Sequence, residues 1–304
     1  MSDQRILRIY LDDQLRGDAI DGHFKIMGRI KNAFEGQGFR VDYVKNSDAE
    51  RAKSIMRRGY SLFYMDHPLH ARALTLRKAY FFPFWRIEKS AKRWEWDIAK
   101  APFKPSDIDP NKAKKFADYR RGLFLDGRAP MPSEGIVYIP LQGRLLEQRS
   151  FQTQSPLDMI RTTLIHEEMR DVVVGLHPGE TYLPEELAAL RSLVDKEPRL
   201  QLSSLPAVEL LQHCDYVVTQ NSSVALMGYF FNKPAVLFAQ IDFHHIAANV
   251  SELGAQEAIQ SAPSMTPDFE RYVFWFLRDT AIHGGQDDVE DRILDEVRQR
   301  GWDV

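Results

Sequence analysis

The sequence predicts an α/β protein made of two doubly wound domains, each a mostly parallel sheet between helices. In both halves of the chain, short apolar segments alternate with amphipathic segments of helical period, which is the pattern of parallel α/β layers. The 304 residues are enough for two domains of about 150 residues. Turn-forming residues cluster in DGRAPMPSEG at 126–135 and mark the predicted boundary between the two domains.

The first domain is predicted over residues 1–134. Its expected strands are 5–11, 38–44 and 61–65, and its expected helices are 22–36 and 48–58. Residues 70–125 interrupt this alternation with the aromatic and basic run AYFFPFWRIEKSAKRWEWDIAK and a helix at 110–121. We therefore expect residues 70–125 to be an insertion on the first domain.

The second domain is predicted over residues 135–266, where the alternation returns. Its expected strands are 135–142, 171–178, 199–202, 215–223 and 234–240, and its expected helices are 156–169, 184–196, 206–213 and 223–231. Residues 267–304 contain two further helical patterns, at 268–282 and 287–301.

The composition favours a cytoplasmic protein. Hydrophobic residues make up 44% of the chain, and no apolar run approaches the roughly 20 residues of a membrane-spanning helix. The start, MSDQRILRIYLDD, lacks the apolar core of a signal peptide. Cys214 is the only cysteine, which excludes an intrachain disulfide and a multi-cysteine metal site.

The net charge of −3 hides an asymmetry along the chain. Residues 1–135 hold 27 Lys and Arg against 18 Asp and Glu, whereas the remainder holds 13 against 25. Unequal decoration of solvated faces is one explanation; attraction of an anionic substrate, or peripheral association of the basic half with the inner membrane, is another. Nucleic acid is not expected as a partner, because the basic residues are dispersed and no nucleic-acid-binding motif accompanies them.

Three predicted strands of the second domain end in polar residues. They end in LQ at 141–142, HPGE at 177–180 and QNSS at 220–223. Ligands of open α/β sheets bind beyond the carboxyl ends of the strands, where helix N-termini offer free N–H groups to anions. We therefore expect these three strand ends to face one crevice.

Two of these segments are candidate nucleotide-binding groups. Asn221, Ser222 and Ser223 offer hydroxyls and a helix start to a phosphate, although they also fit an ordinary helix N-cap. His177 supplies an imidazole on a loop that Pro178 stiffens, although a His-Pro dipeptide is also typical of a structural turn.

Several common motifs are absent from the sequence. It contains no Gly-x-Gly-x-x-Gly after a strand, no P-loop and no Gly-x-Ser-x-Gly. Asp242, His244 and His245 could suggest a metal, but neighbouring side chains point apart on a strand or a helix. We therefore predict no metal site.

Three blocks of the second half resemble the capsule polysaccharide biosynthesis family. These are YIPLQGRLLEQRSFQTQSPLDMI, VVVGLHPGE and LLQHCDYVVTQNSSVALMGYFFNKPAVLFA, which occur in the family's order and span about residues 136–250. The better-known members are GT-B-type glycosyltransferases that transfer Kdo from CMP-Kdo. The resemblance implies a GT-B-like fold, with two Rossmann-like domains facing across a cleft and the last helices packing back on the first domain.

The resemblance also implies roles for individual residues. His177 with Pro178, and Ser222 and Ser223 with Asn221, match elements that hold the phosphate and ribose of CMP, and Gln142 is a weaker cleft residue. Relatives usually carry an acidic residue where this chain has Met227, which implies altered donor binding. The family's acidic motif in the first half has no safe counterpart here.

A catalytic group is expected from the first domain. Sugar transfer needs a carboxylate or histidine beside the anomeric carbon, as base or nucleophile. Asp66 and His67 follow a predicted strand, and Glu88 lies among aromatic and cationic residues. Alternatively, Asp66 caps a helix, and Glu88 forms an ion pair with Arg86, Lys89 or Arg93.

The leading hypothesis is a glycosyltransferase that transfers a sugar from a nucleotide-activated donor, a CMP-sugar favoured, to a glycan or glycolipid acceptor. No cofactor or metal is required if helix dipoles and hydroxyls neutralise the leaving phosphate. Two alternatives remain: a sugar-nucleotide epimerase or hydrolase on the same scaffold, and a noncatalytic binding protein derived from a transferase.

Overall fold

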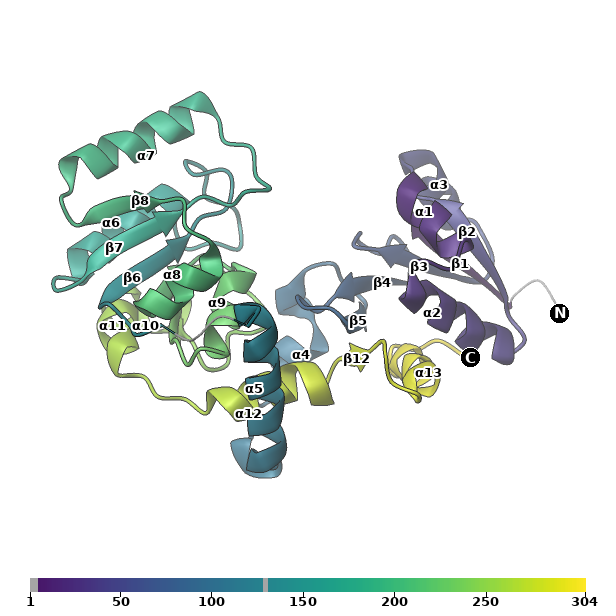
Figure 1. The fold of residues 1–304 in the computed structure, drawn as a ribbon. Coiled ribbons are helices and arrows are strands. Elements are labelled where there is room, and N and C mark those ends of the chain that lie inside the picture. The colour runs from purple at the N-terminus through teal and green to yellow at the C-terminus, as the bar shows by residue number, and fades with distance from the viewer. Residues whose placement is uncertain (1–4, 128–130) are drawn as a thin grey trace. The chain divides into compact units, whose positions relative to one another are not determined.

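The computed structural model describes residues 5–127 and 131–304 and divides the chain into two compact units (Figure 1). Unit 1 comprises Met1–Ala101 together with Phe276–Val304, and unit 2 comprises Pro102–Trp275. Each unit contains a six-stranded sheet. Unit 1 is therefore assembled from two segments that are far apart in the sequence.

The sheet of unit 1 has the strand order β12-β5-β4-β3-β1-β2. Its strands are β1 (Ile6–Leu11), β2 (Arg40–Lys45), β3 (Tyr60–Tyr64), β4 (Ala73–Lys78), β5 (Phe84–Glu88) and β12 (Ile282–His283). Strands β1 to β4 pair in parallel, whereas β5 is antiparallel to β4 and β12 is antiparallel to β5. The sheet is therefore a doubly wound core with two antiparallel strands added at one edge.

The α-helices of unit 1 differ in how much apolar surface they bury. They are α1 (Asp13–Ile20), α2 (Lys25–Gly36), α3 (Asp48–Ser54), α4 (Asp97–Lys100) and α13 (Val289–Gln299). Helix α13 buries Val289, Ile293 and Val297, which recur every four residues and so lie on one side of the helix. This side packs with α2 and the sheet in one apolar core.

The sheet of unit 2 is parallel throughout, with the strand order β11-β10-β9-β6-β7-β8. Its strands are β6 (Ile136–Pro140), β7 (Asp171–Gly175), β8 (Leu200–Ser203), β9 (Cys214–Thr219), β10 (Ala235–Leu237) and β11 (Ala248–Asn249). Strands β6, β7 and β9 are rich in buried Val and Ile, as expected of parallel strands that are covered on both faces.

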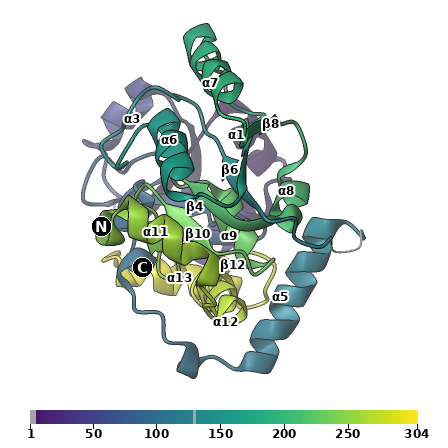
Figure 2. The ribbon, with the colours of Figure 1, turned by 90° about the vertical axis from the view of Figure 1, so that its left-hand side faces the viewer.

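Most helices of unit 2 follow its strands. They are α5 (Pro110–Leu125), α6 (Pro156–His166), α7 (Pro184–Lys196), α8 (Ala207–His213), α9 (Ser223–Tyr229), α10 (Val250–Leu253), α11 (Ala255–Ser261) and α12 (Phe269–Val273). Helices α6 and α11 lie against each other (Figure 2). Proline occupies the first turn of α5, α6 and α7, where its missing N–H costs no hydrogen bond.

The structure differs from the sequence-based expectations at the domain boundary. The turn formers at 126–135 predict a division there, yet the units divide after Ala101. Helix α5 belongs to unit 2 because Phe124 packs against Phe230 and Arg121 Nε donates to the Phe230 carbonyl at 2.6 Å. Residues 276–304 join unit 1 through β12 and α13, whereas 267–275 stay in unit 2.

Residues 70–125 are not an insertion as expected. Strands β4 and β5 belong to the sheet of unit 1, and Leu74, Leu76, Trp85 and Ile87 belong to its main core. The predicted helix at 22–36 corresponds to α2, which begins at Lys25, whereas α1 was not predicted; Asp12 caps α1, and Gly22, with φ of 78°, separates it from α2. No helix within the described part of the chain is long and apolar enough to cross a membrane.

Candidate functional site

A pocket of about 470 Å³ lies at the carboxyl edge of the unit 2 sheet. Its lining includes residues that follow four parallel strands: Leu141 after β6, His177 and Pro178 after β7, Ser204–Ala207 after β8, and Ser222 after β9. Loops after parallel strands share one edge, which explains why these distant segments meet. The described lining contains no Asp, Glu, Lys or Arg, so its polar groups are hydroxyls, backbone groups and one imidazole.

The structure brings three predicted residues into this pocket: His177, Pro178 and Ser222. Gln142, Asn221 and Ser223 are not part of its lining but are chain neighbours of residues that are. The expectation that the ends of β6, β7 and β9 meet at one cavity therefore agrees with the geometry.

The loop after β7 holds the His177 ring in a defined orientation. The His177 backbone N–H donates to the Tyr182 hydroxyl at 2.8 Å, and the Gly179 N–H donates to His177 Nδ1 at 3.0 Å. A neutral imidazole that accepts at Nδ1 carries its hydrogen on Nε2. The exposed side chain of His177 therefore presents an N–H donor.

The loop after β6 is fixed by a buried carboxylate. Glu186, in the first turn of α7, is 4% exposed and accepts from the Leu145 N–H at 2.5 Å and from the Leu183 N–H at 2.8 Å. The loop after β6 is thereby tied to the start of α7. The same loop touches the one after β7, because a Cβ on Gly143 would lie 2.6 Å from Glu180 Oε2.

The segment after β9 places one hydroxyl at the pocket. Ser222 caps α9, its Oγ accepting from the Val224 N–H at 3.3 Å, and its own hydroxyl hydrogen stays available as a donor. Ser223 is exposed, and Asn221 is partly buried. Met227 lies partly buried on α9, where the resemblance leads one to expect an acidic residue.

Sequence reasoning missed the contribution of β8 and of Tyr138. Ser203–Ala207 lines the pocket, and its Ser-Ser-Leu-Pro run follows a predicted parallel strand, so the rule applied to β6, β7 and β9 would have found it. Tyr138 also lines the pocket, and its hydroxyl has no hydrogen-bond partner in the described part of the chain. Burial raises the pKa of Tyr138, so its hydroxyl stays protonated and can donate.

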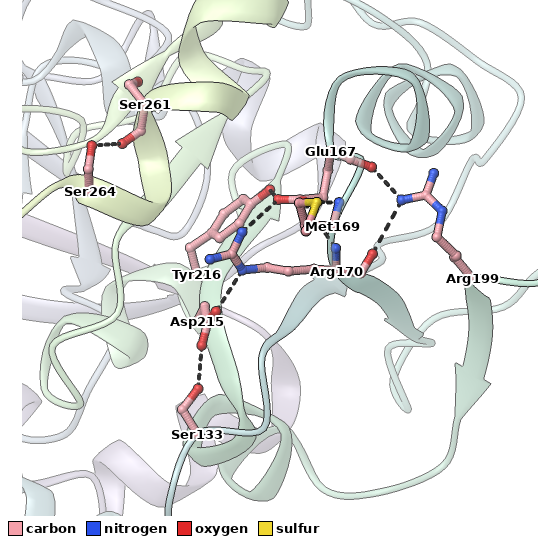
Figure 3. Close-up of polar contacts among 9 residues, drawn as sticks. All are labelled: Ser133, Glu167, Met169, Arg170, Arg199, Asp215, Tyr216, Ser261 and Ser264. Atoms are coloured by element: carbon pink, nitrogen blue, oxygen red, sulfur yellow. Dashed lines mark hydrogen bonds and ion pairs between the residues drawn. The ribbon is translucent and has the colours of Figure 1, made fainter.

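A polar network fixes the opposite, amino edge of the same sheet (Figure 3). Glu167 accepts from the Tyr216 hydroxyl at 2.8 Å and from the Met169 N–H at 2.9 Å. Arg170 Nε donates to Asp215 at 2.6 Å, and Asp215 also accepts from Ser133 Oγ at 2.5 Å. The network joins residues that precede or begin β6, β7 and β9 and has a structural role away from the pocket.

The predicted catalytic residues Asp66, His67 and Glu88 belong to unit 1. Asp66 follows β3 and, rather than capping a helix, accepts from Asn46 Nδ2 at 2.5 Å and lies 3.4 Å from Arg51 Nη1. His67 is exposed, and its Nδ1 accepts from the Ala91 N–H at 3.3 Å. The two side chains therefore lie at the carboxyl edge of the unit 1 sheet.

Glu88 is far less accessible than the other two candidates. It is 3% exposed, and its carboxylate lies 3.1 Å from Arg300 Nη2 on the turn after α13. The expected ion-pair partners of Glu88 are Arg86, Lys89 or Arg93, yet its carboxylate pairs with Arg300, and Arg86 acts on it as a nearby charge. Burial raises the pKa of Glu88, and Arg300 opposes this shift.

The adjacent histidines also differ from expectation. The rings of His244 and His245 stack with centroids 4.4 Å apart instead of pointing in opposite directions. The argument from strand or helix geometry does not hold because the segment lies between β10 and β11 in neither element. In the described ranges, no group of three or more His, Cys, Asp or Glu side chains is placed to hold a metal ion.

Comparisons with known proteins show similarity in structure only. No family model and no curated protein matches the sequence. The solved structure of Thermosulfurimonas dismutans KpsC, a beta Kdo 2,7 transferase, is 12% identical, with a TM-score of 0.51 over 97% of this chain and 99% of that chain. Its beta Kdo 2,4 transferase counterpart is 10% identical, with a TM-score of 0.48 over 88% of this chain and 89% of that chain.

The UDP-GlcNAc 2-epimerase of Methanocaldococcus jannaschii, in complex with UDP-GlcNAc and UDP, is also similar. It is 10% identical, with a TM-score of 0.36 over 97% of this chain and 99% of that chain. The first of the three similarities defines the fold class. The chain has a GT-B-like α/β fold with two Rossmann-like units.

Proposed function

We propose that this protein is a glycosyltransferase that transfers a sugar from a nucleotide-activated donor, with a CMP-sugar favoured, to a polysaccharide or glycolipid acceptor in surface polysaccharide biosynthesis. The observation that carries the proposal is the pocket of unit 2, where residues after β6, β7, β8 and β9 meet. The GT-B-like fold, shared with a Kdo transferase, supports the proposal at the level of architecture.

The pocket offers the groups that a nucleoside monophosphate needs for binding. Ser222 Oγ–H and His177 Nε2–H are donors suited to phosphate oxygens, and Leu205, Pro206 and Pro178 provide apolar walls for a base or ribose. Donors on the phosphate stabilise the charge that develops as the glycosidic bond to the nucleotide breaks. The donor itself is the only small molecule that the proposal requires.

Unit 1 would supply the acceptor side and the catalytic group. Asp66 is the favoured base, because Asn46 and Arg51 orient its carboxylate while it stays partly exposed; His67 is the neighbouring candidate. Glu88, predicted with them, is buried against Arg300, so the proposal gives it a structural role. The surplus of basic residues in 1–135 is not a property of unit 1 alone, because residues 102–135 belong to unit 2 and the acidic segment 276–304 joins unit 1.

Calorimetry with CMP, CDP and UDP tests nucleotide binding. We expect His177→Ala and Ser222→Ala each to weaken binding about tenfold or more, because each removes a donor to a charged phosphate. Ser264→Ala is the matched control, since Ser264 donates to the Ser261 carbonyl and does not line the pocket (Figure 3). No binding of any nucleotide, or equal binding by all variants, would contradict the proposal.

Mass spectrometry of the products tests the transfer reaction. Consumption of the donor only when an acceptor is present is the expected result, whereas conversion without acceptor would indicate an epimerase or hydrolase. Asp66→Asn should lower turnover about 100-fold or more and leave nucleotide affinity within twofold, because the base acts on the acceptor hydroxyl. Unchanged turnover would remove Asp66 from the catalytic role.

A further inference from the structure

The loop between β6 and α6, residues 141–155, extends along the carboxyl edge of the unit 2 sheet. Its first residue, Leu141, lines the pocket. Its far end is bound to the strands beyond, because Thr153 N–H donates to the Phe238 carbonyl at 2.8 Å and Gln220 Nε2 donates to the Gln154 carbonyl at 3.0 Å. The loop is therefore pinned at both ends, at β6 and at β9 and β10.

Arg149 occupies the middle of this loop in a fixed position. Its backbone N–H donates to Gln152 Oε1 at 2.7 Å, and its guanidinium lies over the Phe151 ring with 4.9 Å to the centroid. Gln152, 6% exposed, is held in place next to it. Arg149 is therefore placed by its surroundings before any ligand arrives.

The Arg149 guanidinium has no acceptor among the described residues. Its Nε is buried without a hydrogen-bond partner, and so is Nε2 of Gln152 beside it. Arg144, on the same loop, has an ion-pair partner, because its Nη1 lies 3.3 Å from Glu147 Oε1. Other arginine Nε atoms of the described residues are also buried without a partner, but Arg149 has a second unsatisfied donor, Gln152 Nε2, next to it on a loop that borders the pocket. An acceptor supplied from outside would satisfy both donors.

Charged groups of both signs lie near Arg149. Burial and Arg144 lower the pKa of Arg149, while Glu147 and Glu180 act in the opposite direction without forming an ion pair with it. Glu180 belongs to the loop of His177, so Arg149 is near the loops that form the pocket. The described pocket lining itself carries no cationic Lys or Arg.

We propose that Arg149 binds a second anionic group of the donor, beyond the phosphate attached to the nucleoside. The group is either the carboxylate of an acidic sugar or the second phosphate of a nucleoside diphosphate, both of which a guanidinium can bind through paired N–H groups. This inference rests on the proposed function and adds to it a residue that selects the class of donor.

Calorimetry separates the two sources of charge. The ligands are CMP, CDP and CMP-N-acetylneuraminate, with UMP and UDP as a second pair. Arg149→Gln should weaken the binding of either the two diphosphates or CMP-N-acetylneuraminate about 10- to 100-fold. The affinities for CMP and UMP, which lack a second anionic group, should stay within twofold. Loss confined to CDP and UDP identifies the second phosphate, and loss confined to CMP-N-acetylneuraminate identifies the sugar carboxylate.

Two variants complete the design. Arg149→Lys should restore part of the lost affinity, since it keeps the charge without the planar fork. Arg144→Gln is the matched control, because Arg144 is an arginine of the same loop that already has Glu147, and it should bind all ligands like the wild type. Thermal unfolding of each variant checks that the loop remains folded.

The outcomes distinguish this inference from the proposed function. If the wild type binds CMP or UMP but Arg149→Gln weakens no ligand, or weakens monophosphates equally, Arg149 does not bind a second anion and the proposed function stands. If the wild type binds no nucleotide, both are overturned.

Discussion

Glu88 and Arg300 form an ion pair that is almost fully shielded from water in unit 1. Their side chains are 4% and 6% exposed, and Arg300 also lies 2.6 Å from Glu296. Removing two charges from water is costly, so such a pair adds little net stability, but removing one partner leaves the other charge buried alone. The two single substitutions should therefore have unequal effects.

Arg300→Met should destabilise unit 1 by about 3–5 kcal/mol, because the buried Glu88 then loses its ion-pair partner. Glu88→Gln should cost about 1 kcal/mol or less, since Arg300 keeps Glu296. Urea unfolding of the single and double variants measures both values. Equal losses of unfolding free energy in the two single variants would contradict the idea that the unpaired Glu88 carboxylate causes the larger destabilisation.

The same pair has a defined pH dependence. Because burial raises the pKa of Glu88 above its ordinary 4.5, the folded state holds that proton to higher pH than the unfolded state. The stability contributed by this group is thus full below 4.5 and falls as pH rises through its raised pKa. The stability of wild type relative to Glu88→Gln should decline over that interval, and a difference independent of pH would contradict this account.

At the residue scale, the sequence allowed a prediction where a residue's position follows from the strand just before it. His177 and Ser222 could be predicted because each closely follows a recognisable parallel strand, and strand ends of a parallel sheet meet. The Arg300 partner of Glu88 could not, because 212 residues separate the two. The sequence also gives no reason to propose Arg149, because a loop arginine shows no sign in the sequence of lacking an acceptor.

At the scale of elements, Glu186 links α7 to the loop that borders the pocket. Glu186→Ala leaves the Leu145 N–H without an acceptor at a fully buried position, which costs about 1–3 kcal/mol. We expect that loss in urea unfolding, together with weaker nucleotide binding because the loop after β6 loosens. Glu185→Ala, at the adjacent exposed position, is the control and should change neither measurement.

Strands and helices with clear periodicity were predicted close to their observed bounds. Helix α7 was expected at 184–196 and spans Pro184–Lys196. Strands β4 and β5 were missed because their buried stretches carry Arg and Glu, which mask a core strand; Arg86 and Glu88 are 5% and 3% exposed. Short elements such as β11 depend on pairing with β10 and leave no pattern of their own.

At the scale of the whole molecule, unit 1 depends on the last part of the chain. Residues of β12 and α13 belong to its main core, and Trp302 stacks on Tyr60 with centroids 4.5 Å apart. The sequence could not predict that residues 276–304 share the core of unit 1. Its composition shows where turn-forming residues cluster, as at the predicted boundary 134/135, but not which distant segments pack together.

A chain ending at Trp275 should therefore lose unit 1 while unit 2 persists. Without α13, the apolar side of α2 and one face of the sheet lose their cover. Limited proteolysis should degrade residues 1–101 and spare 102–275, and nucleotide binding should remain. Protection of residues 1–101 equal to that in the full chain would contradict the dependence.

The interleaving of the two units also orders events during synthesis. The ribosome completes residues 102–275 before it makes 276–304, so unit 2 has all of its sequence while unit 1 still waits for β12 and α13. The nascent chain can thus contain a folded unit 2 while the first segment of unit 1, residues 1–101, still lacks its C-terminal partner segment. Until residues 276–304 have been synthesised, the early strands of unit 1 expose apolar surface to which a chaperone can bind.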